Sequence, residues 1–470
     1  MPAHPAGSRY ADVAPAGPHL SMPTTPSQMH ALPTRIWPAS AQRGIDGELI
    51  LGGVDVRDAV QRYGSPLFLL DEAHFHDLGA LYRASYGDAD VYYASKAFLC
   101  GTVARWVDQA GLSLDVASGG ELELALRAGF PAHRILFHGN NKSTAEIGRA
   151  LDAGVGRIVL DSFIEVARVA AAAAEREVVA DVLVRVTLGV EAHTHEFIAT
   201  AHEDQKFGLS VSSGDAMEAV RRVRNLPSLH LLGLHSHIGS QIFDAAGFEV
   251  AAHRMVRFAA AVREEIGHPV AEINLGGGMG IAYTEHDDPP QVAAMAQQLR
   301  DIVAGECIAA GLPRPRLAFE PGRALIGPVG ITVYEVGTVK RVELDAGAAR
   351  TYISVDGGMS DNIRTALYDA EYTVTLASRV SQADPVLCRV VGKHCESGDI
   401  VIRDAWLPAD LAPGDLLAVA GTGAYCRAMA SNYNYLPKPA VVAVRDGGGT
   451  EVLRRETFDD MFRLDPAVHP

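Results

Sequence analysis

Positive charge is scarce in this 470-residue chain, and lysine is its rarest source. The formal net charge is −16, and lysine occurs at 6 positions against 35 for arginine. Nucleic acids and anionic membrane surfaces attract basic chains, so this composition argues against either as the main partner. The sequence also contains no run of 18 apolar residues, the length that a membrane-spanning helix needs. We therefore predict binding to neither nucleic acid nor membrane.

Cysteine is sparse as well. The five cysteines are scattered and odd in number, and no two of them form a Cys-x-x-Cys pair. This pattern is typical of free thiols in a reducing compartment and argues against a disulfide framework or a zinc site. Two His-x-His pairs, His193/His195 and His235/His237, lack an obvious third ligand, so we predict no metal site. The sequence predicts a cytoplasmic protein.

Eight short apolar runs alternate with helix-compatible stretches between residues 91 and 320. The runs are Val91–Ala97, Leu114–Ser118, Ile135–Gly139, Ile158–Asp161, Val182–Leu188, Leu231–Ile238, Ile273–Gly276 and Leu317–Glu320. Strands that alternate with helices are typical of parallel sheets. Eight such units in about 230 residues predict an α/β fold, a closed (β/α)₈ barrel of the TIM type. A doubly wound open sheet is the alternative.

The segments outside these runs differ in composition and in hydrophobic pattern. Residues 1–42 have no periodicity and no apolar core of a secretory signal, so we expect a disordered leader there. We expect one or more N-terminal strands over 43–65 that join a β domain, and the barrel over 66–328. The strand-like runs joined by turns over 329–470 predict an all-β C-terminal domain.

Chemically useful residues collect at the carboxyl ends of the predicted strands, where barrel enzymes carry their active sites. Lys96 ends the first run, His237 the sixth, three consecutive glycines (276–278) the seventh, and Glu320 the eighth, three residues before Arg323. Glycines let backbone N–H groups approach a phosphate closely. A lysine amine, a phosphate loop, a carboxylate and an imidazole at one barrel mouth together indicate a pyridoxal phosphate site.

In this interpretation each group has one task. Lys96 carries the cofactor aldehyde as a Schiff base, and the three glycines hold the phosphate. Glu320 keeps the pyridine nitrogen protonated, and His237 lies flat against the ring. Taken singly, each feature has a plainer explanation: a lysine that reaches the rim, a tight glycine turn, or an ion pair between Glu320 and Arg323.

Nine ordered motifs strengthen the assignment. They are YYASKAF, DVASGGEL, HGNNKS, HTHEFIATAHEDQKFG, HSHIGSQ, NLGGGMGI, EPGRALIG, GKHCESGD and GAYCRAMASNYN. From about residue 45 to 462 the sequence resembles the diaminopimelate decarboxylase family, within the alanine racemase/ornithine decarboxylase-like (fold type III) pyridoxal phosphate enzymes. The resemblance implies a barrel with a β domain that works as a homodimer, and active sites that contain residues of both protomers.

The resemblance also implies roles for residues. It assigns cofactor contacts to Lys96, His237, Ser240, Gly276, Gly277, Gly278, Glu320, Pro321, Gly322, Arg323 and Tyr425. It assigns substrate contacts to Arg323, Arg364, Tyr368, Glu396 and Tyr425. Cys395, contributed by the partner subunit, would donate the proton after loss of CO₂, so that Lys96, Cys395 and His237 form the catalytic set.

The expected reaction is decarboxylation of the small amino acid meso-2,6-diaminopimelate to L-lysine, the last step of lysine biosynthesis. Its distal centre carries both an ammonium and a carboxylate, so a cation such as Arg364 is needed beside the acid Glu396. A decarboxylase of ornithine, lysine or arginine needs only the acid, and remains the first alternative. Alanine racemase is another enzymatic alternative, but that family places an arginine against the ring nitrogen. Glu320 at this position favours decarboxylation. A non-catalytic pyridoxal phosphate-binding protein is the alternative outside enzymes.

Overall fold

The computed structural model describes residues 21–190, 206–343 and 349–468, which fold into two compact units. Unit 2 comprises residues 76–280 and 289–325, and unit 1 comprises the rest of the described chain. The HTHEF motif lies outside the described residues. None of the helices in the described ranges combines the length and the apolar character that a membrane crossing requires.

Unit 2 is a closed barrel of eight parallel strands, as predicted. The strands are β5 (Asp90–Ala94), β6 (Ser113–Val116), β7 (Ile135–Phe137), β8 (Arg157–Leu160), β9 (Ala180–Thr187), β11 (Leu229–His235), β12 (Glu272–Asn274) and β13 (Arg316–Phe319). Their order around the sheet is β9-β11-β12-β13-β5-β6-β7-β8, and pairing of β8 with β9 closes the ring. The open-sheet alternative is therefore wrong. A short strand β10 (Leu209–Ser210) adds to β9 outside the ring.

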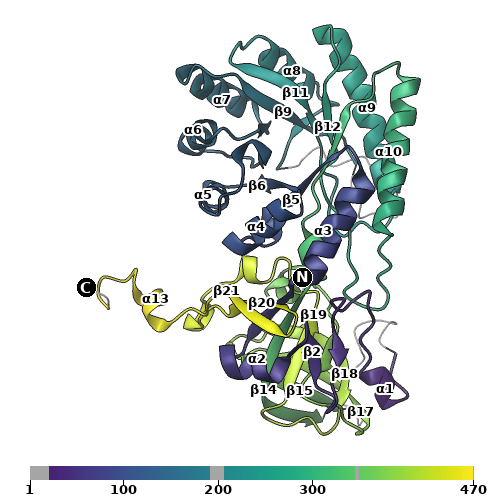
Figure 1. The fold of residues 1–470 in the computed structure, drawn as a ribbon, viewed down its shortest axis with the longest axis vertical. Helices are drawn as coiled ribbons and strands as arrows, with labels where there is room; N and C mark the ends of the chain where they lie inside the picture. Colours follow the sequence, from purple (N-terminus) through teal and green to yellow (C-terminus); the bar gives the residue numbers. More distant parts are fainter. Residues whose placement is uncertain (1–20, 191–205, 344–348, 469–470) are drawn as a thin grey trace. The chain divides into compact units, whose positions relative to one another are not determined.

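Helices alternate with the strands of the barrel, and the first of these helices precedes β5 (Figure 1). They are α3 (Glu72–Tyr86), α4 (Gly101–Gln109), α5 (Gly119–Arg127), α6 (Thr144–Ala153), α7 (Phe163–Glu175), α8 (Asp215–Arg224), α9 (Ala246–Ile266), α10 (Val292–Ala309) and α11 (Arg323–Ile326). Serine hydroxyls cap three of them: Ser118, Ser143 and Ser162 each accept a backbone N–H of the first helical turn. These caps begin each helix just after a strand ends, and the strand ends stay free to present side chains.

The interior of the barrel is a packed core. Tyr92, Leu136, Val159, Leu183 and Ala318 come from five different strands and are buried together. Alternate residues of a strand point to opposite faces, so these side chains fill the ring while their neighbours meet the helices. The filled interior leaves the carboxyl ends of the strands as the face for chemistry.

Unit 1 is built on a nine-stranded sheet. Its strands are β4 (Leu67–Asp71), β14 (Gly330–Glu343), β15 (Ala349–Val355), β16 (Val374–Leu376), β17 (Pro385–Val391), β18 (Ile400–Pro408), β19 (Leu416–Ala420), β20 (Ala440–Arg445) and β21 (Gly448–Leu453). A three-stranded antiparallel sheet contains β1 (Gln42–Arg43), β2 (Leu49–Leu51) and β3 (Val54–Asp55). Four short helices complete the unit: α1 (Pro26–Met29), α2 (Val56–Tyr63), α12 (Arg364–Tyr368) and α13 (Phe458–Phe462).

The unit boundaries differ from the predicted ones. Residues 66–75 were expected in the barrel, but β4 pairs with β14 and β20 of unit 1, and its five residues are buried there. Residues 281–288 also belong to unit 1. Residues 43–65 supply β1–β3 and α2 rather than a strand of the large sheet.

The leader is shorter than expected. Ile36 and Trp37 are each 1% exposed and lie in the core of unit 1 beside residues of β2, β4 and β14. His30 is buried too, and its Nε2 lies 3.1 Å from the backbone N and O of Ser381. Residues 30–42, which were expected in the leader, therefore belong to the folded unit.

Candidate active site

Lys96 lies where the sequence places it, immediately after β5. It sits in a short 3₁₀ turn, Ser95–Ala97, and is exposed. The hydroxyl of Tyr93 donates to the backbone oxygen of Phe98 at 2.6 Å and fixes this turn. The side chain is exposed, so burial does not remove water from its ammonium group. This position agrees with a lysine that reaches the rim of the barrel.

The turn that carries Lys96 adjoins the segment that carries Glu320. Strands β5 and β13 are neighbours in the ring, and the N–H of Ala94 donates to the oxygen of Pro321 at 3.3 Å. A Cβ on Gly322 would come within 2.8 Å of the Ala94 side chain, so glycine is required for this approach. The amine and the acid thus belong to adjacent strand ends of one barrel mouth.

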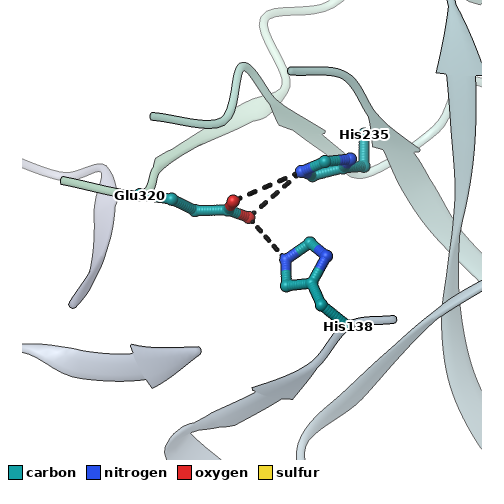
Figure 2. Close-up of side chains that lie close together, drawn as sticks. All are labelled: His138, His235 and Glu320. Atoms are coloured by element: carbon teal, nitrogen blue, oxygen red, sulfur yellow. Dashed lines mark hydrogen bonds and ion pairs between the residues drawn. The ribbon is translucent and has the colours of Figure 1, made fainter. Parts of the chain in front are cut away.

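Glu320 is a buried carboxylate that accepts hydrogen bonds from three side chains. Its Oε1 lies 2.9 Å from His138 Nε2, 2.8 Å from Asn274 Nδ2 and 3.2 Å from His235 Nε2. Its Oε2 lies 3.4 Å from His235 Nε2. Figure 2 shows the two imidazoles converging on the carboxylate from different strand ends. The contacts of the Glu320 carboxylate are therefore with His138, His235 and Asn274, and not with Arg323 as the ion-pair alternative requires.

Burial sets the charge states of the cluster. It lowers the pKa of His138, and it lowers the pKa of His235 to about 4, in both cases against the attraction of Glu320. Both rings are therefore neutral near pH 7. Burial alone would raise the pKa of Glu320, but the two histidines outweigh it and hold that pKa well below the usual range. The cluster carries one negative charge.

The buried negative charge of this cluster indicates which kind of ligand fits the site. Burying an unpaired carboxylate is costly, and a ring nitrogen that carries a proton supplies the missing positive charge. Among the described residues, His138, His235 and Glu320 also bring three possible donor atoms for a metal within 4.8 Å of one another, but the neutral rings and the carboxylate equally suit a protonated ring nitrogen. The residues at this mouth fit a protonated pyridine ring, with the acid and the lysine on neighbouring strand ends.

The glycine loop joins the sixth, seventh and eighth strand ends. A Cβ on Gly277 would lie 2.1 Å from the Glu320 backbone oxygen, and one on Gly276 would lie 2.5 Å from that of Ser236. Gly276 (φ 70°) and Gly278 (φ 118°) also adopt left-handed backbone angles. The glycines are thus required first by close contact between loops. That contact keeps the backbone compact at the point where a phosphate is expected.

Except for Tyr425 of unit 1, the other residues expected at the cofactor occupy the same rim. The Arg323 Nη2 donates to Ser240 Oγ at 2.9 Å, and the Gly277 N–H donates to His237 Nδ1 at 3.3 Å. Burial and the nearby charge of Lys96 lower the pKa of His237 well below its ordinary value, so this ring is neutral as well. Unit 2 therefore brings together Lys96, His237, Ser240, the glycines, Glu320, Pro321, Gly322 and Arg323.

Two ionisable groups at the mouth, one buried and one half-buried, were not assigned a role from sequence. Asp115, on β6, is buried, and burial together with Glu320 raises its pKa well above the usual range, against the effect of Lys96. Arg185, on β9, lies 3.7 Å from Asp161. In the sequence, Asp161 and His138 stand at the ends of apolar runs, and Arg185 lies within the fifth run. The amide of Asn274 gave no comparable signal.

Apart from Arg323 of unit 2, the residues expected at the substrate belong to unit 1. Arg364, at the start of α12, is 6% exposed and donates to the hydroxyl of Tyr372. Its guanidinium carbon lies 5.0 Å from the centre of the Tyr283 ring and 5.5 Å from that of the Tyr372 ring. Neither contact is with a carboxylate. Tyr368, at the end of the same helix, is 61% exposed.

A hydrogen-bonded turn carries Cys395 and Glu396. The Cys395 N–H donates to Asn434 Oδ1 at 3.2 Å, and His394 Nδ1 lies 3.2 Å from the same oxygen. The Cys395 thiol is exposed, whereas the other four cysteines are buried. Tyr425 has a left-handed backbone with φ 60°, an unusual conformation for a non-glycine residue and one that often marks functional sites.

The sequence matches a known enzyme family. Residues 73–327 match the family described as "Pyridoxal-dependent decarboxylase, pyridoxal binding domain". The diaminopimelate decarboxylase of Mycobacterium tuberculosis H37Rv is 56% identical over 93% of this chain and 99% of its own length. That of Bacillus subtilis 168 is 44% identical over 89% of this chain and 95% of its own length.

Solved structures give the same result. The crystal structure of a diaminopimelate decarboxylase from M. jannaschii in complex with L-lysine is 29% identical, with a TM-score of 0.84, and the match covers 92% of this chain and 99% of that one. The Helicobacter pylori enzyme complexed with L-lysine is 27% identical, with a TM-score of 0.79, over 88% of this chain and 100% of that one.

Proposed function

Because the chain belongs to the diaminopimelate decarboxylase family of pyridoxal-dependent decarboxylases, we infer that it converts meso-2,6-diaminopimelate to L-lysine and CO₂ with pyridoxal phosphate as cofactor. The structural observation that carries this conclusion is the ionised, buried Glu320 on the strand end next to Lys96. The bound cofactor supplies an electron sink for the electrons of the breaking bond to the carboxylate.

The residues of unit 2 would bind and orient that cofactor. Lys96 would hold it covalently through Nζ until the substrate amine replaces it. Glu320 would keep a proton on the ring nitrogen, and the neutral His237 would support one face of the ring. Ser240, Arg323 and the glycine loop (276–278) would hold the phosphate, which suits a rim with a guanidinium and small residues.

The residues of unit 1 would select the substrate and return a proton. Arg364 would bind the distal carboxylate, because it is a buried cation packed against tyrosines rather than acids. Tyr368 and Tyr425 would lie beside it, and Glu396 would take the distal amine. The exposed thiol of Cys395 would deliver the proton that replaces CO₂.

We further propose that the enzyme works in the cytoplasm as a homodimer. None of the five cysteines, all of which lie in the described ranges, forms a disulfide, as expected for a reducing compartment. Aromatic side chains near the C-terminus are exposed, among them Tyr435 at 62% and Phe458 at 61%. Exposed aromatics of this size favour a protein surface as their partner. In a dimer, Cys395 and Glu396 of one protomer would complete the site of the other.

The direct experiment is an assay of CO₂ release by the purified holoenzyme. We expect turnover of meso-diaminopimelate and a much lower rate with ornithine, lysine or arginine. Preference for one of those three amino acids would favour the basic amino acid decarboxylase alternative. Cofactor binding without CO₂ release from any of them would favour a non-catalytic pyridoxal phosphate-binding protein.

A further inference from the structure

The three donors around Glu320 are distributed unequally over its two oxygens. Oε1 faces His138, Asn274 and His235 at 2.9, 2.8 and 3.2 Å, whereas Oε2 has only the 3.4 Å contact with His235. A carboxylate oxygen has two lone pairs, so Oε1 is saturated. Oε2 is the oxygen with acceptor capacity left (Figure 2).

The orientation of each donor is fixed by a second contact or by its acceptor. Asn274 Oδ1 accepts the Gly276 N–H at 2.8 Å, so its Nδ2 must face Glu320. A carboxylate can only accept, which requires a proton on Nε2 of both histidines. The two rings also contact each other edge to face, with centroids 4.7 Å apart and planes at 64°. The carboxylate therefore cannot turn without breaking several contacts.

The donors are neutral, and this matters for the charge that Glu320 can offer. An arginine or lysine in their place would neutralise the carboxylate and weaken its attraction for a ring proton. Neutral imidazoles satisfy the oxygen and leave the negative charge available. The other ionisable groups that act on the cluster are Lys96, Asp115 on β6 and Arg185 on β9.

We propose that His138 and His235 are positioning residues that hold Glu320 ionised, saturate its Oε1 and leave Oε2 as the acceptor for the protonated ring nitrogen of the cofactor. This inference rests on the proposed function. It assigns a task to two histidines that contact the acid rather than the substrate, and it explains why a buried acid at this mouth is surrounded by donors without charge.

The test measures the ring nitrogen itself. The holoenzyme is loaded with pyridoxal phosphate that carries ¹⁵N in the ring, and the ¹⁵N chemical shift is followed against pH by NMR. The variants are His138→Ala, which removes one donor, and His138→Gln, whose side-chain amide can still donate. The matched control is His230→Ala, because His230 lies at the end of β11 opposite to His235, where its Nδ1 contacts Asp181 at 2.7 Å.

We expect the unsubstituted protein and the His230→Ala control to keep the ring nitrogen protonated up to the same pH. In His138→Ala the proton should be about tenfold less tightly held, and the apparent affinity for the cofactor should fall about tenfold, since a hydrogen bond to a charged group is lost. His138→Gln should restore most of both quantities.

An unchanged ¹⁵N titration and an unchanged affinity in His138→Ala would overturn the inference. So would a defect that His138→Gln does not reverse, because the ring would then only fill space. If His138→Ala does not fold by circular dichroism, His235→Asn is read in the same way. A neutral ring nitrogen in the unsubstituted protein would instead contradict the role of Glu320, and absence of cofactor binding would contradict the proposed function.

Discussion

At the scale of single residues, the barrel mouth separates groups that carry charge from groups that only donate hydrogen bonds. Glu320 keeps its charge because His138, His235 and Asn274 donate to it without neutralising it. In unit 1 the reverse holds for Arg364, a cation held among the tyrosines Tyr283 and Tyr372. We propose that each charged group is arranged to bind a ligand of opposite charge.

The first residue-scale prediction concerns Lys96. Replacing Lys96 with alanine removes the amine that would bind the cofactor covalently, so we expect loss of the visible absorption of the bound cofactor and loss of CO₂ release. Absorption spectra of the purified variant, before and after borohydride treatment, measure the attachment. A Lys96→Ala protein that retains the band would contradict the assignment.

A second prediction concerns substrate choice. Arg364→Ala should lower kcat/KM for meso-diaminopimelate by about a hundredfold or more, because a buried carboxylate of the substrate would lose its cation. Cofactor affinity should not change. The matched control is Arg379→Ala, which removes an arginine of the same unit that contacts Asp410 and Asp415 instead. Equal kinetics of the two variants would refute the role of Arg364.

A third prediction concerns acid stability. Burial lowers the pKa of His235 to about 4 in the folded protein, whereas the pKa of a histidine in an unfolded chain is about 6.5. Below pH 6.5 the unfolded chain takes up a proton that the folded chain refuses, so the contribution to stability is complete above 6.5 and is lost as pH falls towards 4. We expect about 3 kcal/mol from this group.

Urea unfolding of the holoenzyme at pH 7 and pH 4.5 measures the effect. The unsubstituted protein should lose more stability between these two values than His235→Asn, which does not titrate. His230→Asn, exposed at the other end of β11, serves as the control and should behave like the unsubstituted protein. An equal loss in His235→Asn would show that another group governs the acid limb.

Which residues could be predicted from sequence depends on the distance along the chain to their partners. Lys96 and Glu320 stand at strand ends, and a strand end is visible as the last residue of an apolar run. Asn274 acts through a contact with Glu320, 46 positions away, and Tyr283 through Arg364 and Tyr372, 81 and 89 positions away. No local pattern carries such contacts, so these residues were missed.

At the scale of elements, the barrel strands were predictable because each is a short, mostly buried run that contains apolar residues and alternates with helix-compatible segments. The N-terminal segment was not, because Ile36 and Trp37 stand alone among prolines and polar residues. Their burial depends on β2, β4 and β14 rather than on a local repeat. The same reason explains β4, whose apolar run resembles a barrel strand but pairs within unit 1.

The element-scale prediction compares two glycines. Gly277→Ala would place a Cβ 2.1 Å from the Glu320 backbone oxygen, so the β12 and β13 ends must move apart. We expect cofactor affinity to fall by about tenfold or more and the unfolding midpoint to drop, since overpacking costs about 1–3 kcal/mol. Binding titrations and thermal unfolding measure both.

Gly305→Ala is the matched control. Gly305 lies within α10, and nothing lies within 4 Å of the position its Cβ would take. Alanine is the better helix former by about 0.5–1 kcal/mol, so this variant should be slightly more stable with unchanged cofactor binding. If Gly277→Ala matched the control, close contact at the glycine loop would not be what requires glycine.

At the scale of the whole molecule, the proposed dimer predicts complementation. Cys395→Ala should slow turnover while the cofactor absorption persists, and Lys96→Ala should be inactive. After the two variants are mixed, half of the dimers are mixed dimers, each with one intact site. About a quarter of the unsubstituted activity should therefore return, if sites are shared across the two-fold axis. No recovery, with mixed dimers present by mass spectrometry, would contradict shared sites.

Because β4 lies between β14 and β20, it cannot complete its pairing until late in the synthesis of the chain. Leu67–Leu70 leave the ribosome early, yet the partners for both edges of this strand end at residues 343 and 445. At about 5–20 residues per second, the apolar strand waits roughly 20–70 s for its second neighbour. The barrel can close during that wait, so the interval before release from the ribosome is when this chain most needs protection from aggregation.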